Sequence, residues 1–90
     1  MYTINYLKSA EKYFKKIKDK HLLSAYKTAI DKLEINPYIG QQKSGDLRGI
    51  WCFDVKYAKT NYEIAYRIYE ENGKLLVVIL AGHAKIFTKN

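Results

Sequence analysis

The sequence is poor in the features that define secreted, disulfide-bonded and membrane proteins. Its single cysteine, Cys52, has no partner for a disulfide within the chain and supplies no cysteine-based metal set. No segment approaches the roughly twenty consecutive apolar residues that a membrane-spanning helix needs. The first residues, MYTINYLKSAEKYF, carry charges too early for a signal peptide. We therefore expect a soluble protein of the reducing cytoplasm, with no membrane partner.

Histidine and arginine are also scarce. The two histidines, His21 and His83, are far apart and the carboxylates are scattered, so no spacing of metal ligands is present. We expect no metal ion and no other cofactor. Among the 16 basic residues only Arg48 and Arg67 are arginines. This composition argues against base-specific recognition by bidentate arginine and favours contacts to phosphate.

Positive charge exceeds negative charge by a wide margin. The 16 Lys and Arg residues against 9 Asp and Glu residues give a formal net charge of +7. That excess predicts attraction to a polyanion, which is nucleic acid, an acidic protein, or both. A lysine-rich surface that serves only solubility is the plainer alternative.

The first half of the chain predicts a strand and two helices within a single domain, residues 1–90. Residues 2–6 alternate apolar and polar side chains, which is typical of a short strand. Apolar residues at helical spacing predict amphipathic helices over residues 9–17 and 22–33, and Pro37 follows the end of the second. We expect these helices to form a hairpin on one side of a sheet.

Three strands are predicted in the second half. Residues 51–57 and 62–68 alternate aromatic or β-branched side chains with polar ones. Asn72-Gly73 predicts a tight turn, and residues 75–81 are apolar throughout, as expected of a central strand. Because the helices precede a run of adjacent strands, the class is α+β, with a short N-terminal strand, a helical hairpin and an antiparallel three-stranded meander packed on the helices.

The alternation also assigns side chains to the two faces of the predicted sheet, because residues two apart on a strand share a face. One face collects the aromatic residues and belongs to the core. The other face collects Asp54, Lys56, Glu63 and Arg67, and His83 arrives nearby at the end of the last strand. We place the functional site on this half-polar face.

Several motifs together resemble the RelE/ParE superfamily of toxins from bacterial type II toxin–antitoxin pairs. They are a strand, a basic helical pair, and the segments NPYIG (36–40), GDLRGIW (45–51) and YEIAY (62–66), followed by a strand that ends in Gly82-His83. The resemblance covers nearly the whole chain. It implies a small antiparallel sheet with two helices on one face, and a toxin whose partner is a cognate antitoxin protein.

The ending GHAKIF (82–87) is similar to the ending of the YafQ branch of mRNA-cutting toxins. In that branch the histidine works as the acid and a phenylalanine sits beside it, which implies these roles for His83 and Phe87. The resemblance thus implies a ribosome-dependent mRNA endoribonuclease that contacts 16S ribosomal RNA. Its mRNA substrate and its antitoxin are the expected partners.

The chain departs from RelE itself, which carries cations where Asp54, Glu63 and Ala84 stand here, whereas Lys56 matches one of the cleft lysines of RelE. These departures argue against a mechanism based on lysine and arginine, and a mechanism based on histidine and carboxylate remains. RNA is cut without metal when its 2′-hydroxyl attacks the adjacent phosphate, which requires a base, charge stabilisation and an acid for the departing 5′ oxygen. His83 is the best candidate acid, because the ordinary pKa of histidine, about 6.5, leaves both forms available at neutral pH.

The candidate residues fall into two groups. We expect catalysis from His83, Glu63, Lys56 and Phe87, and RNA or phosphate binding from Arg48, Arg67, Asp54, Tyr57 and Tyr62. In this scheme Glu63 or Asp54 is the base, Lys56 and Arg67 hold the phosphate, and the tyrosines stack on bases. Each residue has a plainer alternative: Glu63 forms a cross-strand ion pair with Lys56, Arg48 anchors its own loop, and the tyrosines belong to the core.

Two competing functions stay open at this point. One is a ParE-like toxin that inhibits DNA gyrase and is not a nuclease, for which a free histidine in the cleft is unnecessary. The other is a catalytically impaired basic binding domain, because Asp54 and Glu63 are acidic where the superfamily's nuclease carries cations.

Overall fold

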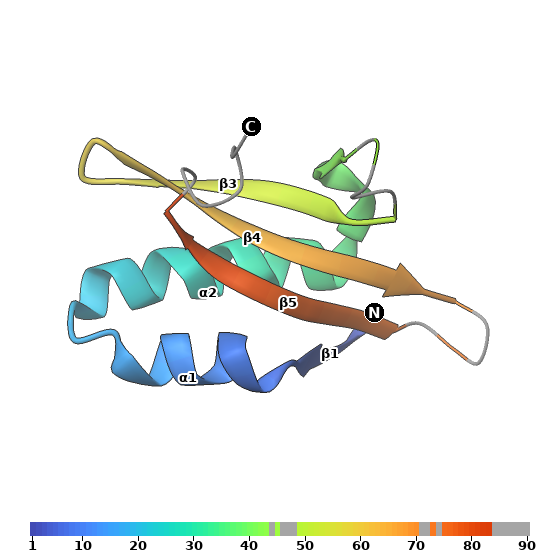
Figure 1. Cartoon of the computed structure of the whole chain (residues 1–90), viewed down its shortest axis with the longest axis horizontal. Helices are drawn as coiled ribbons and strands as arrows, with labels where there is room; N and C mark the ends of the chain where they lie inside the picture. The colour runs from blue at the N-terminus through green and yellow to red at the C-terminus, as the bar shows by residue number, and fades with distance from the viewer. Residues whose placement is uncertain (44, 46–48, 71–72, 74, 84–90) are drawn as a thin grey trace.

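Five strands form one sheet in the order β1-β5-β4-β3-β2 (Figure 1). The computed structural model describes residues 1–43, 45, 49–70, 73 and 75–83, and only the backbone of residues 75–80 and 83. The strands are β1 (Thr3–Tyr6), β2 (Gln41–Gln42), β3 (Trp51–Tyr57), β4 (Thr60–Tyr69) and β5 (Leu75–His83). The helices are α1 (Lys8–Lys16), α2 (Lys20–Ile35) and the short 3-10 helix η1 (Pro37–Ile39).

Both long helices cover the same face of the sheet (Figure 1). Strands β2 to β5 pair antiparallel with their neighbours, and β1 pairs parallel with β5 at one edge. The predicted α+β class, with a short N-terminal strand, two helices and an antiparallel meander, is confirmed. No described helix covers the opposite face of the sheet, which we call the outer face.

The expected central position of the apolar run over residues 75–81 is wrong, because β4 is the middle strand. The run forms most of β5, which lies between β1 and β4 and is therefore still an interior strand. The sheet extends further on the other side because Gln41 and Gln42 pair with Trp51 and Cys52. Two residues are too few to show a period in the sequence, so this segment was expected to be loop.

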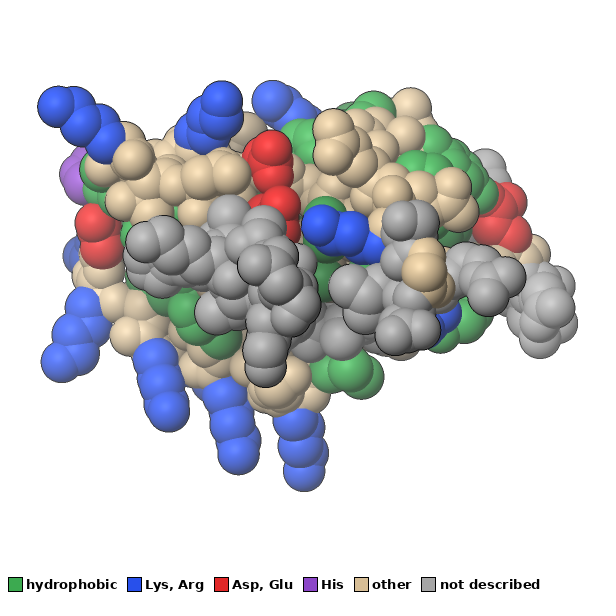
Figure 2. All heavy atoms as spheres, turned by 45° about the horizontal axis from the view of Figure 1, so that its top comes forward, with side chains coloured by type: hydrophobic (Ala, Val, Ile, Leu, Met, Phe, Trp, Pro, Cys, Tyr) green, Lys and Arg blue, Asp and Glu red, His purple; other side chains and the backbone are tan. Residues whose placement is uncertain are grey.

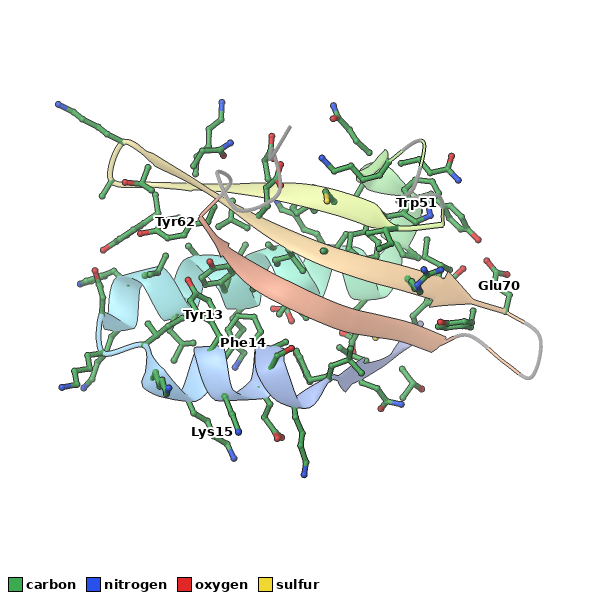
Figure 3. All side chains as sticks on the ribbon, in the orientation of Figure 1. Tyr13, Phe14, Lys15, Trp51, Tyr62 and Glu70 are labelled. Atoms are coloured by element: carbon green, nitrogen blue, oxygen red, sulfur yellow. The ribbon has the colours of Figure 1, made fainter. Side chains whose placement is uncertain are left out.

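The core lies between α2 and the helix-facing side of β3 and β4. Tyr26 and Leu33 of α2 pack with Ile64 and Tyr66 of β4, and all four side chains are almost fully buried. Aromatic rings extend this core toward α1, with Tyr13, Phe14, Tyr26 and Tyr62 in edge-to-face contacts at centroid distances of 5.2 to 5.8 Å (Figure 3). Such contacts add to the stabilisation from burial alone. This core holds the helix-facing side of the sheet in place.

Asp19 connects the start of α2 to the end of β3 through hydrogen bonds. Its carboxylate accepts hydrogen bonds from the backbone N–H of His21 (2.9 Å) and Leu22 (3.3 Å), which caps the helix. The Tyr57 hydroxyl donates to both carboxylate oxygens, at 3.1 and 2.9 Å. The Tyr57 bond is the main reason why the pKa of Asp19 is lowered. This contact holds the β3–β4 hairpin against the helical layer.

The β3–β4 hairpin turns at Ala58 and Lys59, whose φ angles of 49° and 65° are left-handed. Tight two-residue hairpin turns require this geometry. Neither residue is a glycine or an asparagine, so no turn motif marked this hairpin in the sequence. At the predicted Asn72-Gly73 turn, Gly73 has a φ of 116°, and Asn72 lies outside the described residues.

Candidate functional site

The register between β3 and β4 decides which side chains share the outer face. Val55 is opposite Tyr62 and Phe53 is opposite Ile64, at positions that face the helices. The alternate positions therefore face outward, and among them Asp54 is directly opposite Glu63. Asp54 and Lys56 are exposed at these positions. The predicted gathering of Asp54, Lys56 and Glu63 on one face is confirmed.

The alternative reading of Glu63 as an ion-pair partner of Lys56 is wrong. Glu63 is opposite Asp54, and Lys56 is opposite Asn61. Sequence spacing could not distinguish these registers, because a hairpin turn one residue longer or shorter changes every cross-strand pair. The structure thus brings two carboxyl groups together on neighbouring strands.

Glu63 is a buried carboxyl group with one unsatisfied oxygen. Only 8% of the residue is exposed, and its Oε1 has no hydrogen-bond partner among the described residues. Burial is the main cause that raises the pKa of Glu63, a hydrogen bond with Asp54 raises it further, and the charge of Lys43 opposes the shift. Glu63 therefore retains its proton to higher pH than an ordinary glutamate does.

A hollow of about 150 Å³ opens beside the two carboxyl groups, between β3, β4 and the segment that follows α2. Its lining includes Asp54 and Glu63 together with Gln41, Cys52 and Ile39. Burial raises the pKa of the Cys52 thiol to about 11, so this cysteine is protonated and unreactive at neutral pH. The polar chemistry of the hollow belongs to the carboxyl groups.

The wall of this hollow depends on the absence of a side chain at Gly40. The Tyr66 hydroxyl passes beside Gly40 and donates a 2.7 Å hydrogen bond to the carbonyl oxygen of Pro37. A Cβ atom at Gly40 would lie 2.2 Å from that hydroxyl and 2.7 Å from the carbonyl oxygen of Cys52. Gly40 therefore lets the backbone between η1 and β2 lie close to β3 and β4.

Gly40→Ala is expected to lower the free energy of unfolding by about 1–3 kcal/mol, because the clash pushes η1 and β2 away from β3 and β4. Chemical denaturation followed by circular dichroism measures the change. Gln41→Ala, next to it on the exposed side of the same segment, is the control and should change stability by less than about 0.5 kcal/mol. Equal stability of Gly40→Ala and wild type would contradict the close approach.

Arg67 lies further along the outer side of β4, beside Gly49. A Cβ atom at Gly49 would be 2.8 Å from Nη1 of Arg67, and the φ of Gly49 is 90°. The glycine of the LRG motif thus makes room for the guanidinium group. Ala65 separates Arg67 from Glu63 along the strand, and Arg48 lies outside the described residues.

The two tyrosines expected to stack on bases are on the side of the sheet that carries the helices. Tyr57 donates its hydroxyl hydrogen to Asp19, and the Tyr62 ring packs at 5.8 Å on Tyr26 of α2 (Figure 3). The structure therefore does not bring them to the outer face with Asp54 and Lys56.

His83 ends β5 beside the carboxyl pair. In the backbone register Gly82 is opposite Glu63, and His83 is opposite Tyr62. The side chain of His83 lies outside the described residues, as does the whole of Phe87. The strand that carries the predicted acid therefore passes directly next to the pair.

Lys43 is the residue of this site that sequence reasoning missed. It follows β2, and its backbone N–H donates a 2.8 Å hydrogen bond to the carbonyl oxygen of Ile50. Its charge acts on both Glu63 and Cys52, so it is a second cation near the hollow, in addition to Lys56. The two-residue β2 that positions it has no pattern in the sequence that could have revealed it.

Lysine side chains also form a basic surface along α1. The helix exposes Lys8, Lys12, Lys15 and Lys16, Lys18 follows it, and Lys20 is the first residue of α2. Figure 2 shows Lys and Arg side chains projecting in a row from the lower edge of the molecule, and Lys15 points away from the sheet in Figure 3. We call these six residues the α1 lysine row.

The arrangement of sheet and helices is that of known bacterial toxins. A chain in the crystal structure of the toxin–antitoxin complex RelBE2 from Mycobacterium tuberculosis matches with a TM-score of 0.71 and 23% identity, over 91% of this chain and 96% of that one. A mutant of the E. coli toxin RelE in the free state matches with a TM-score of 0.74 and 18% identity, over 94% of this chain and 85% of that one. These likenesses establish the fold.

Residues 4–90 match the family model of the ParE-like toxin of type II bacterial toxin–antitoxin systems. The chain therefore belongs to the ParE-like toxin family. No curated protein matches it significantly. Among the described residues, no helix has the length and apolar character needed to cross a membrane.

Proposed function

We propose that this toxin is a ribosome-dependent endoribonuclease of the kind represented by the YafQ branch, and that it arrests translation by cutting mRNA. The observation that carries the proposal is the outer face, where Asp54 and Glu63 are paired beside Lys43 and Lys56. Two carboxyl groups and two cations next to a hollow are the groups that metal-independent cleavage needs. The likeness in fold to RelE, and the tail motif of the sequence, also support it.

In the proposed reaction the 2′-hydroxyl of a nucleotide attacks its own 3′ phosphate. A carboxylate of the Asp54–Glu63 pair takes the hydroxyl proton, and Lys56 stabilises the charge that develops on the phosphate oxygens. His83 protonates the departing 5′ oxygen, and Phe87 takes the accompanying role that the tail motif implies. Arg67 and Arg48 bind phosphates of the RNA.

The α1 lysine row supplies the contact to ribosomal RNA in this proposal. Phosphate contacts by lysine release bound counterions, so the affinity falls steeply as salt rises. Lysines on one exposed helix are well placed for this role because their charges are not neutralised by nearby carboxylates, Glu11 being the one acidic residue of α1.

Lys12→Glu/Lys16→Glu is expected to weaken ribosome binding by about tenfold or more in 0.1 M salt and to reduce the salt dependence of log K by about two units. Lys27→Glu/Lys32→Glu on α2 makes the same change of charge and is the matched control, with a smaller effect. Sedimentation with ribosomes at several salt concentrations measures both. Equal weakening by the two double variants would mean that net charge, and not the α1 lysine row, governs binding.

An antitoxin is the proposed protein partner. The crystal structure of RelBE2, similar to this chain in fold, is that of a toxin–antitoxin complex. An acidic or amphipathic antitoxin segment would neutralise the basic surface. A groove of about 720 Å³ between α1 and α2 suits an amphipathic segment, because Phe14, Ile17 and Ile30 line it. Its charged lining is mixed, with Lys15 and Lys27 beside Glu11, Asp31 and Glu34.

The test is to induce the gene and to follow RNA and DNA in the same cells. The proposal predicts that translated mRNAs are cut within minutes and that growth stops, while chromosomal DNA stays intact. Accumulating DNA breaks with intact mRNA would instead identify a gyrase inhibitor. Growth arrest without either lesion would show that the toxin acts only by binding.

A further inference from the structure

The two carboxyl groups of the outer face are not equivalent. Asp54 is exposed to solvent, whereas only 8% of Glu63 is exposed. Both line the 150 Å³ hollow, but the Oε1 atom of Glu63 is buried and has no hydrogen-bond partner among the described residues. A substrate that enters from solvent can therefore reach Asp54 and not Glu63.

A proton shared between these groups removes the repulsion between two carboxylates. Each ionised carboxylate is only an acceptor, so two carboxyl groups hydrogen-bond to each other when one of them is protonated. Directly opposite like charges on neighbouring strands are otherwise destabilising. Burial disfavours the charged form of Glu63, which assigns the proton to Glu63 and the negative charge to the exposed Asp54.

We propose that Asp54 is the carboxylate that takes the proton of the attacking 2′-hydroxyl, and that Glu63 is a positioning residue that stays protonated and donates a hydrogen bond to Asp54. This inference rests on the proposed nuclease function and refines the site. It chooses between Glu63 and Asp54, both of which the sequence allowed as the base. The choice follows from burial, which the sequence pattern did not reveal.

The reaction balances with these roles. The free oxygen of Asp54 accepts the proton as the O2′–H bond breaks, the O2′–P bond forms, and the P–O5′ bond breaks. The O5′ atom takes a proton from the imidazolium of His83, the acid of the proposed function. The products are a 2′,3′-cyclic phosphate and a 5′-hydroxyl, and water carries the proton from Asp54 back to the imidazole.

The surroundings determine how this pair responds to pH. Its charged neighbours are Lys43 next to β2, Lys56 on β3 and Arg67 further along β4, and the thiol of Cys52 is protonated. On the β5 side the residue opposite Glu63 is Gly82, which carries no ionisable group. The charge of Lys43 opposes the retention of the proton on Glu63, and among the described residues nothing provides a hydrogen bond to its Oε1.

A protonated Glu63 makes the stability of the protein depend on pH. The pKa of Glu63 is raised above its ordinary value of 4.5, so the folded protein binds a proton that the unfolded chain has lost. Stability therefore falls as the pH rises from about 4.5 to the raised pKa. The rate of RNA cleavage also depends on the proton of His83, so the pH dependence of stability, and not that of the rate, reports on Glu63.

Glu63→Gln and Asp54→Asn distinguish the two roles. A glutamine amide still donates a hydrogen bond to Asp54, so Glu63→Gln should cleave mRNA within about tenfold of the wild-type rate. Asp54→Asn removes the base and should cleave at least about 100-fold more slowly. Asp31→Asn, an equal change of charge on α2, is the control. Rates are measured on a defined mRNA in a reconstituted translation reaction.

Thermal melting between pH 4 and pH 9 provides a readout independent of catalysis. Wild type should lose stability over the range in which Glu63 ionises, and Glu63→Gln should not. Loss of cleavage in a folded Glu63→Gln, with cleavage kept in Asp54→Asn, would overturn the assignment and make Glu63 the base. Equal pH profiles of melting in the two proteins would overturn the shared proton.

Different results would contradict the assignment of Asp54 and Glu63 and the proposed nuclease function. If wild type cuts mRNA but the variants respond in the reverse order, only the assignment of Asp54 and Glu63 fails. If wild type itself leaves mRNA intact on translating ribosomes, the nuclease function fails and the catalytic role of Asp54 fails with it.

Discussion

Replacing His83 with glutamine is expected to lower the rate of mRNA cleavage by at least about 100-fold and to abolish growth arrest. Proton transfer by a positioned side chain typically contributes 10²–10⁴-fold, and glutamine has no group that gives up a proton at neutral pH. The backbone of His83 lies at the end of β5, next to the residue that is opposite Glu63. The substitution therefore removes the proposed acid and leaves the carboxyl pair in place.

His21→Gln is the matched control, because His21 is the other histidine and is exposed in the first turn of α2. It should leave cleavage and growth arrest unchanged. The assay is induction of each variant, with growth and mRNA integrity followed together and circular dichroism used to confirm folding. A folded His83→Gln protein that still cuts mRNA would remove His83 from the mechanism.

Removing the Tyr66 side chain is expected to have the largest effect on stability. Tyr66 is completely buried at the centre of β4, and its hydroxyl donates a hydrogen bond to the carbonyl oxygen of Pro37. Tyr66→Ala leaves a cavity under the sheet and should lower the free energy of unfolding by about 3–5 kcal/mol. This is a large part of the roughly 5–15 kcal/mol that stabilises an ordinary domain.

Tyr66→Phe separates the hydrogen bond from the packing. It keeps the ring but leaves the carbonyl oxygen of Pro37 without its donor, which should cost about 1–3 kcal/mol. Tyr69→Ala, at an exposed position of the same strand, is the control for strand propensity. Denaturant unfolding measures all three. If Tyr66→Ala were no less stable than Tyr69→Ala, the core described here would be wrong.

The parts of the fold that follow from periodicity were predictable. Alternation over residues 51–57 and 62–68 predicts β3 and β4, and it places Asp54, Lys56 and Glu63 on one face. The apolar stripe of the second helix likewise predicts Leu22, Tyr26, Ala29 and Leu33 as core residues, all of which are buried. Patterns of this kind are set by burial of one face of an element, so they are visible in the sequence alone.

The parts that depend on register and on irregular backbone were not predictable. Asp54 is opposite Glu63 because the hairpin turns at Ala58 and Lys59, and these residues carry no turn signature. Gln41 and Gln42 pair as a strand because Gly40 admits the Tyr66 hydroxyl, a contact between segments far apart in the sequence. Leu23, although apolar and next to the buried Leu22, is exposed and lines the groove between the helices.

The roles predicted for the residues of the site differ most from what the structure supports. Spacing alone allowed Glu63 to be a base, an ion-pair partner of Lys56 or a bystander. The burial of Glu63 directly opposite the exposed Asp54 favours instead the proposed pair that shares one proton. The charge of Lys43, whose position depends on the unpredicted β2, also acts on Glu63.

The measurement that tests the nuclease proposal most directly is the chemistry of RNA ends after the purified toxin is added to ribosomes translating a defined mRNA. The account predicts cuts inside the codon that the ribosome occupies, with a 2′,3′-cyclic phosphate on one fragment and a 5′-hydroxyl on the other. Intact mRNA under arrested translation, or fragments that end in a 5′-phosphate and a 3′-hydroxyl, would contradict it.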